Sequence, residues 1–364
     1  MNPINRMAVA LVIASASSAA AAGAQGWDTV QAPTTTSLRG VSAPSRDVVW
    51  VSGARGAVAR SVDGGGTWAM VGVPGTDSLD FRDIHALDAS TAWVLSIGNG
   101  GQSRIYRTTD GGRRWALQFT NTDTAAFYDC FGFWDARRGI AMSDPVGGRL
   151  RILRTDDGGE TWSVLPPERS PVALEGEAGF AASGTCIITA GEGEAWIVTG
   201  GGARSRAHRT RDFGATWQVA DIPPIVAGAA PRGAFTVAHL GDGRLVATGG
   251  NYELPTDTSG VAALSDDSGL TWRAPRGAVP RGYRSGLAAV SGLRGVVVAV
   301  GTSGTDYSLD GGESWVAADT LSLNAVTFAA PDAGWAVGPR GRVVRWRGGF
   351  PRQVPRRDEK EPGR

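Results

Sequence analysis

The sequence predicts an all-β fold built from repeated units of four short antiparallel strands. Three observations support this: an eight-residue motif that recurs six times, short apolar runs separated by glycine, and no helical periodicity after the first residues. The intervals between motif copies match one four-stranded blade, roughly 40–50 residues. Together these features predict a seven-bladed β-propeller.

The recurring motif begins with a hydroxyl residue and has an acid at its third position, a glycine-rich middle and a closing tryptophan. Its six copies are SVDGGGTW, TTDGGRRW, TDDGGETW, TRDFGATW, SDDSGLTW and SLDGGESW. The third-position acids are Asp63, Asp110, Asp157, Asp212, Asp267 and Asp310.

Each repeat also carries four apolar runs in a constant order. The first is a run such as FRDIHAL, and the second often contains tryptophan, as in TAWVLS and EAWIVTG. The third leads into the motif, as in RIYRT, RILRT and RAHRT, and the fourth begins at the motif tryptophan. These runs are rich in β-branched and aromatic residues, so we expect four strands for each repeat.

The two ends of the chain predict how the ring closes. The segment 323–346 has three strand-like runs with no motif after them, and 26–32 looks like a lone fourth strand. Trp27 stands where a motif tryptophan would be. Six complete repeats and one shared blade give seven, and sharing leaves no seam of unpaired strand edges. The propeller should therefore occupy residues 25–350.

The flanking residues predict export and a disordered tail. Residues 1–24 have a basic start, a short apolar run and a small-residue exit at Ala22–Ala24, which is typical of a signal peptide. We expect a periplasmic or secreted monomer whose mature chain begins near Gln25. No later segment is apolar enough to span a membrane, and residues 351–364 are polar and proline-rich. The chain has 36 basic and 35 acidic residues, so its charge gives no reason to expect nucleic acid.

The motif resembles the Asp-box, also called the BNR repeat. In this interpretation it forms the hairpin between the third and fourth strands: the Asp carboxylate accepts backbone N–H bonds and glycine permits positive φ. The tryptophan would fill the wedge between neighbouring blades. Each turn offers one clear carboxylate rather than a cage of oxygens, so we expect a structural motif and not a calcium or catalytic site.

At the level of the whole chain, the sequence resembles bacterial relatives of the photosystem II stability/assembly factor family. The similarity runs from Trp27 to Trp346, and is carried by the six motifs, the Trp-containing second strands, and the segments GFAASGTC and GYRSG. The resemblance implies a seven-bladed Asp-box propeller that holds a membrane-protein subunit during assembly, partly through an arginine patch. We expect an envelope or membrane protein subunit as the partner. Nothing in the sequence indicates a photosynthetic host, so we do not extend the family's photosystem partner to this protein.

Propeller topology predicts where a partner would bind. First strands begin on the face that also carries the second-to-third strand loops, and the motif turns lie on the opposite face. Polar and aromatic residues at these positions should converge on one mouth of the central channel, where we expect a binding site. They are Arg39, Arg82, Asp83, Asp129, Asp144, Glu177, Tyr252, Tyr283 and Arg284.

The alternative function is a sialidase-like glycoside hydrolase, because sialidases are also Asp-box propellers. The arginine triad, the Tyr–Glu nucleophile pair and the acid of such an enzyme could be Arg39, Arg82, Arg284, Tyr283, Glu177 and Asp129. The chain lacks a Phe-Arg-Ile-Pro segment near its N-terminus and has seven predicted blades rather than six. Fold alone does not give chemistry, so we assign no catalytic residue.

The remaining reactive residues are few. His85, His208 and His239 lie in different repeats without ligand spacing, so we expect no metal and no cofactor. Cys130 and Cys186 lie in the first strands of adjacent repeats, one near a strand's start and the other near a strand's end. This placement predicts two buried thiols rather than a disulfide.

Overall fold

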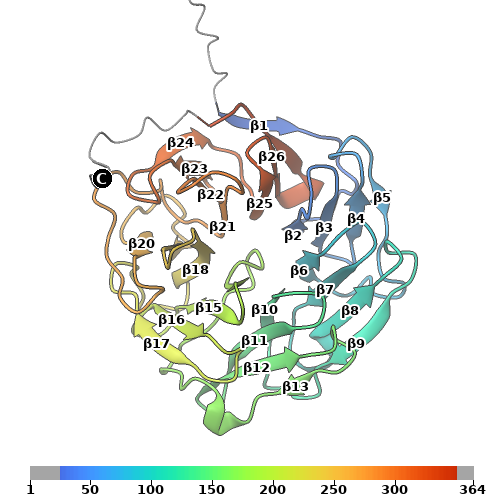
Figure 1. Cartoon of the computed structure of the whole chain (residues 1–364), viewed down its shortest axis with the longest axis horizontal. Coiled ribbons are helices and arrows are strands. Elements are labelled where there is room, and N and C mark those ends of the chain that lie inside the picture. The colour runs from blue at the N-terminus through green and yellow to red at the C-terminus, as the bar shows by residue number, and fades with distance from the viewer. Residues whose placement is uncertain (1–24, 351–364) are drawn as a thin grey trace, which may run out of the picture.

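The computed structural model describes residues 25–350, and these form seven sheets arranged in a ring (Figure 1). The predicted signal peptide and tail lie outside the described residues. No helix within this range is long and apolar enough to cross a membrane. The seven-bladed fold predicted from the sequence is confirmed.

The first four blades follow the chain from the N-terminal side, and each has four antiparallel strands. Blade 1 contains β2 (Leu38–Ser42), β3 (Val49–Gly53), β4 (Val58–Ser61) and β5 (Ala69–Met70); blade 2 contains β6 (Phe81–Ala86), β7 (Ala92–Ser96), β8 (Arg104–Thr108) and β9 (Ala116–Thr120). Blade 3 contains β10 (Tyr128–Phe133), β11 (Gly139–Val146), β12 (Arg149–Thr155) and β13 (Ser163–Val164); blade 4 contains β14 (Ile187–Ala190), β15 (Glu194–Thr199), β16 (Arg206–Thr210) and β17 (Gln218–Asp221).

The last three blades complete the ring. Blade 5 contains β18 (Arg232–His239), β19 (Leu245–Asn251) and β20 (Ala262–Ser265), and blade 6 contains β21 (Gly286–Ala289), β22 (Val297–Gly301), β23 (Gly304–Ser308) and β24 (Val316–Asp319). Blade 7 contains β25 (Ala325–Ala330), β26 (Ala333–Val337), β27 (Val343–Arg347) and the N-terminal β1 (Gly26–Thr29). Three single 3₁₀ turns also occur: η1 (Gly100–Gln102), η2 (Pro167–Arg169) and η3 (Pro339–Gly341).

The ring closes as predicted, through a blade shared by both ends of the chain. Strand β1 pairs antiparallel with β27, and Trp27 lies opposite Trp346. Their rings pack edge to face with centroids 4.8 Å apart. The closing strand therefore contributes an aromatic contact as well as backbone hydrogen bonds.

Blade 5 differs from the expected four strands because of a proline. Leu264 and Arg273 exchange two backbone hydrogen bonds of 2.8 and 2.9 Å, which begins a fourth strand. In blade 1, at the position that Pro275 occupies in blade 5, the amide of Val71 donates to the carbonyl oxygen of Val58. Pro275 has no N–H to donate, so the pairing stops there.

The motif turns carry the same hydrogen bonds from blade to blade. In blade 1, the amide of Gly65 donates to Oγ of Ser61 at 2.8 Å, and the amide of Thr67 donates to Oδ1 of Asp63 at 2.8 Å. Gly65 has a φ of +89°, which only glycine adopts readily. All six motifs connect a third strand to the start of a fourth, as predicted.

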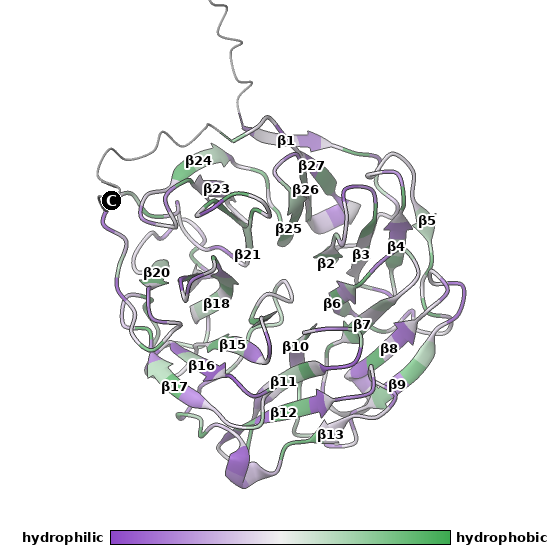
Figure 2. Ribbon diagram, viewed as in Figure 1, coloured by the Kyte–Doolittle hydropathy of each residue, from purple (hydrophilic) through white to green (hydrophobic). Residues whose placement is uncertain are grey.

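Tryptophans join neighbouring blades. Motif tryptophans such as Trp115 and Trp315 pack on the core of the preceding blade, which confirms the predicted wedge. The second strands supply Trp50, Trp93, Trp196 and Trp335, all fully buried. Hydrophobic residues occupy the strands of every blade in Figure 2. The core is therefore a series of layers between blades rather than one central cluster.

Candidate functional site

Backbone irregularities in the innermost strands aim side chains toward the channel. The pairing register shifts by one residue in the first strands of blades 1, 2, 3 and 5, and the residues inside these bulges are Arg39, Arg82, Asp129 and Phe235. A bulge leaves one residue unpaired and re-aims its side chain. Three of the nine predicted binding residues therefore occupy equivalent places around the mouth.

A segment of blade 4, Gly179–Cys186, lies inside the ring and is called the plug below. In Figure 1 it is the yellow-green chain that reaches the centre before β15. The Arg82 guanidinium donates to the carbonyl oxygen of Ala181 at 3.1 Å, and Ser183 Oγ donates to the carbonyl oxygen of Ser285 at 2.6 Å. Since Arg82 belongs to blade 2 and Ser285 to blade 6, the plug crosses the channel.

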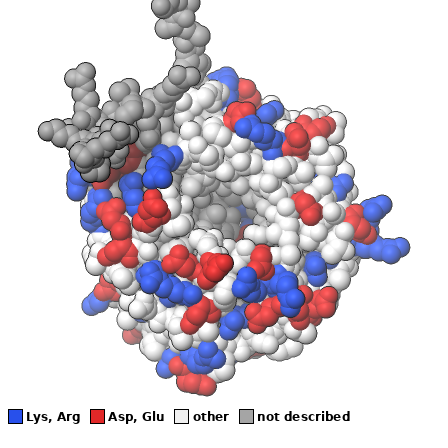
Figure 3. Space-filling view, in the orientation of Figure 1, with Lys and Arg blue, Asp and Glu red and all other residues white. Residues whose placement is uncertain are grey.

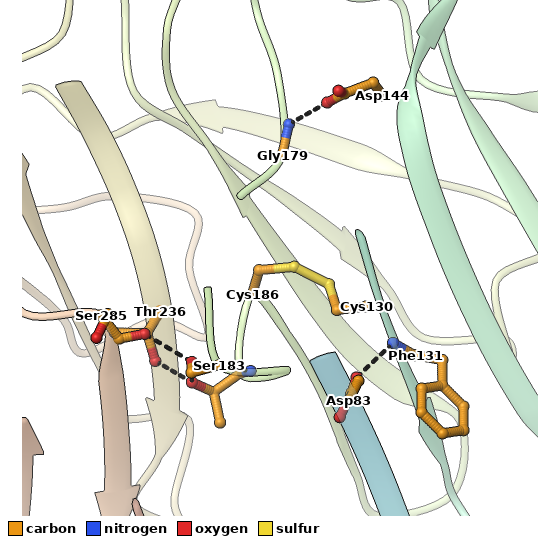
Figure 4. Close-up of a disulfide and its surroundings, with 10 residues drawn as sticks. Asp83, Cys130, Phe131, Asp144, Gly179, Ser183, Cys186, Thr236 and Ser285 are labelled. Atoms are coloured by element: carbon orange, nitrogen blue, oxygen red, sulfur yellow. Dashed lines mark hydrogen bonds between the residues drawn. A yellow bond between two sulfur atoms is a disulfide. The ribbon is translucent and has the colours of Figure 1, made fainter. Parts of the chain in front are cut away.

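The plug changes two sequence-based predictions. The run at Gly179 is not the first strand of blade 4, because that strand begins at Ile187. Cys186 therefore lies beside the start of a first strand, as Cys130 does. The two are joined by a disulfide with Cα atoms 6.4 Å apart, so the prediction of two thiols is wrong (Figure 4).

The two mouth arginines have different surroundings. Arg82 Nε donates to Oδ2 of Asp80 at 2.8 Å, so its charge is paired. The Arg39 guanidinium makes no hydrogen bond or ion pair to any residue that the structure describes between 25 and 350. Burial and the neighbouring Arg82 lower the pKa of Arg39, although Tyr283 and Asp80 oppose this. Arg39 is thus a cation at the mouth without a directly bound acid.

Four aromatic rings form one connected group at the mouth, and one of them, Tyr283, interacts electrostatically with both arginines. Phe180 of the plug stacks on Phe235 with centroids 3.6 Å apart, and Tyr283 packs edge to face on Phe235 at 4.8 Å. The ring centroid of Tyr252 lies 6.5 Å from that of Tyr283, and Tyr252 is 47% exposed. Leu254, two residues later and beyond Glu253, is also exposed. Burial raises the pKa of Tyr283. The mouth therefore combines an unpaired cation with an exposed aromatic and aliphatic edge.

Three of the predicted acids lie against the plug. Asp144 Oδ1 accepts the amide of Gly179 at 2.8 Å, and Asp83 Oδ2 accepts the amide of Phe131 at 2.9 Å (Figure 4). Asp129 Oδ2 has no hydrogen-bond partner among the described residues. The space-filling view shows that this face of the ring is hollowed at its centre, and that charged side chains lie along part of the rim of the hollow (Figure 3).

The two remaining predicted residues, Arg284 and Glu177, are buried and bound to neighbouring side chains, so they are not available to a partner at the channel mouth. Arg284 is 1% exposed, and its Nε donates to Asp306 Oδ2 at 2.8 Å in a buried ion pair. Glu177 accepts bonds from Arg206 at 2.7 Å and from His208 at 2.9 Å. Burial opposes ionisation of Glu177, but the interaction with His208 and hydrogen bonds from Thr199 and the amide of Leu174 prevail and hold its pKa at about 2.

These contacts bear on the hydrolase alternative. The described side chains do not assemble the arginine triad or the Tyr–Glu pair, because Arg284 binds Asp306 and Glu177 binds Arg206 and His208. Between residues 25 and 350 no group of three or more His, Cys, Asp or Glu side chains could hold a metal ion.

Sequence reasoning missed several of these residues. Arg206 and His208 alternate along a third strand and so share one face, which could have indicated a buried acid as their partner. Phe235 carried no such signal, because a bulge is not visible in the apolar run of β18.

Comparisons with known proteins establish the class. No protein-family model matches the chain, and no curated protein matches it by sequence. Solved structures do match, and with the sheet order they define the chain as a seven-bladed β-propeller. One is YCF48 bound to D1 peptide, with 19% identity, a TM-score of 0.62, and coverage of 88% of this chain and 94% of that one.

Two further structures give the same picture. YCF48 from Cyanidioschyzon merolae has 15% identity and a TM-score of 0.63, and the match covers 88% of this chain and 98% of that one. The WD40 β-propeller domain of Doa1 has 12% identity and a TM-score of 0.60, over 89% and 97% of the two chains. YCF48 is thus among the structural neighbours, in line with the resemblance seen in the sequence. Identities this low establish the fold alone.

Proposed function

We propose that this protein is an exported binding scaffold that holds a peptide segment of an envelope or membrane protein at the channel mouth. The observation that carries the proposal is Arg39, a half-buried guanidinium with no described hydrogen-bonding partner. It interacts electrostatically with Tyr283, whose ring centroid lies 6.5 Å from that of the exposed Tyr252.

The electrostatics favour an acidic group on the partner. Removing a cation from water is costly unless an opposite charge replaces the lost hydration. A carboxylate of the partner would supply that charge and accept up to two parallel N–H bonds from Arg39. Tyr252 and Leu254 offer apolar surface to the residues next to that carboxylate.

The comparisons support this proposal by analogy. One neighbour of similar shape is YCF48 bound to D1 peptide, so a ring of this kind can hold a peptide. The assignment of a binding role to this chain rests on the mouth geometry, because the shared identity is 19%.

The test is site-specific photo-crosslinking. A photo-reactive phenylalanine analogue at position 252 is expressed in the native host, and crosslinked proteins are identified by mass spectrometry. Arg39→Gln should reduce the crosslinked partner at least tenfold, while Arg114→Gln should leave it unchanged. Arg114 is a matched control because it is an exposed arginine on a motif turn, on the opposite face. Equal crosslinking in both variants would contradict the proposal.

A further inference from the structure

The backbone of the plug packs directly on carboxyl groups of blades 2 and 3. A Cβ atom on Gly184 would collide with Oδ1 of Asp83, and one on Gly179 would lie 2.9 Å from Oδ2 of Asp129. Gly184 also has a φ of +79°, which favours glycine. Asp83 is 6% exposed and Asp129 is 2% exposed. The plug is therefore part of the cover that keeps these carboxyls from water.

Few charges face these carboxyls. Arg82 is the cation nearest to Asp129, but its guanidinium is paired with Asp80 and also donates to the plug. On the side of blades 5 and 6, the plug contacts two uncharged groups, the hydroxyl of Thr236 and the carbonyl oxygen of Ser285.

The plug adds no charge of its own. It contains no acid, base or histidine, and its one cysteine is bonded. The nearest titratable neighbour of Asp129 is Asp144, a second acid. Two adjacent carboxyls in a covered place disfavour each other's ionisation.

These surroundings make the carboxyls hold protons at unusually high pH. Burial raises the pKa of Asp83 to about 7 and that of Asp144 to about 6. Burial and the nearby Asp144 raise the pKa of Asp129 well above its usual range, although hydrogen bonds from the amides of Asp144 and of Ala181 in the plug oppose this. A carboxyl in water titrates near pH 4. By linkage, a conformation that hydrates these groups therefore gains stability over the covered one as the pH rises above about 4.

We propose that the plug is a pH-sensitive lid on the channel mouth, seated while Asp83, Asp129 and Asp144 carry protons and displaced as they ionise. The disulfide with Cys130 fixes Cys186 to blade 3, so the movement is expected in residues 179–185. The lid would control access to the mouth beside Arg39, and in that role it rests on the proposed function. The movement itself requires no partner.

The test is hydrogen exchange of the mature protein without any partner, at about pH 5 and about pH 8, with rates corrected for chemical exchange. Protection of residues 179–185 should fall at least about tenfold at the higher pH, because one pKa unit corresponds to tenfold. Protection of β15 should not change. Equal protection of residues 179–185 at both pH values would overturn the proposal.

Variants identify the carboxyls responsible. Asp144→Asn and Asp129→Asn should each weaken the pH dependence of plug protection. Asp123→Asn should keep it, and is a matched control because Asp123 lies before β10 and is paired with Arg151 at 2.8 Å. If Asp129→Asn does not fold, Asp144→Asn carries the test, since Asp144 is only partly buried. Wild-type pH dependence in Asp144→Asn would overturn the proposal. The two proposals can fail separately. If plug protection depends on pH as expected but Arg39→Gln does not reduce crosslinking, the proposed function is refuted and the lid is not.

Discussion

The indole nitrogen of Trp93, in the second strand of blade 2, donates a 3.0 Å hydrogen bond to the carbonyl oxygen of Gly158, in the motif turn of blade 3. The same bond joins blade 4 to blade 5, from Trp196 to Ser268 at 2.8 Å. Two of the four second-strand tryptophans thus couple one blade to the motif of the next.

Trp93→Phe should lower the free energy of unfolding by about 1–3 kcal/mol, because it leaves the Gly158 carbonyl without its donor. Urea unfolding measures the change. Trp335→Phe is the control: Trp335 is also a fully buried second-strand tryptophan, and its indole nitrogen has no partner among the described residues, so its loss removes no bond. An equal loss in both variants would show that ring volume, and not the bond, is responsible.

Arg284→Ala should destabilise the fold by up to about 3–5 kcal/mol, because it leaves the buried Asp306 with only the more distant Arg281, 3.8 Å away, as an ion-pair partner. The double variant Arg284→Met, Asp306→Leu should recover much of this loss, since it removes both charges. Thermal unfolding compares the two. A stable Arg284→Ala protein would contradict a structural role for this pair.

Asp157→Ala should cost about 0.5–1.5 kcal/mol, because only one of the three hydrogen bonds that Asp157 accepts comes from a buried residue. The donors are the hydroxyl of the buried Thr155 at 2.8 Å, and the hydroxyl and amide of Thr161 at 2.6 and 3.0 Å. The effect is modest because Thr161 is exposed and water can replace the lost acceptor. Asp156→Ala, at an exposed acid one residue earlier, should have no effect on the urea midpoint.

Ionisation of Asp83 should lower the free energy of unfolding as the pH rises. Burial raises its pKa to about 7 in the folded protein, against about 4 in the unfolded chain. Its contribution is therefore complete below about pH 4 and is lost as the pH rises to about 7. Urea unfolding between about pH 4 and pH 8 should show this loss in the wild type and a smaller loss in Asp83→Asn. Identical profiles would mean that Asp83 is hydrated in the folded state.

The purified protein should not hydrolyse sialosides or aryl glycosides, since Glu177 is held by Arg206 and His208 and is not free to act. Turnover that disappears in Glu177→Gln or Tyr283→Phe would restore the hydrolase alternative.

The parts of the fold that repeat could be predicted from the sequence. A period, a motif and two complementary chain ends were enough for seven blades and for the pairing of Trp27 with Trp346. The plug could not be predicted, because the residues around Phe180 form an apolar run that reads as a strand. Its position follows from contacts with four other blades.

The candidate site was predictable only in outline. Topology placed Arg39, Arg82 and Asp129 at one mouth, and bulges at equivalent places bring them together. Topology could not distinguish Arg39 from Arg284, because pairing with Asp306 depends on packing between strands.

The shared blade has a consequence for how the chain folds. Gly26 pairs with Arg347, so the first described strand has no partner until almost the whole chain has been made. Synthesis at roughly 5–20 residues per second leaves that strand waiting for tens of seconds. Joining ends so distant costs loop entropy, which makes closure slow compared with the formation of a single blade. Until the ring closes, the blades on either side of the gap, blades 1 and 7, expose apolar faces. The nascent protein is therefore most prone to aggregate when it is nearly complete.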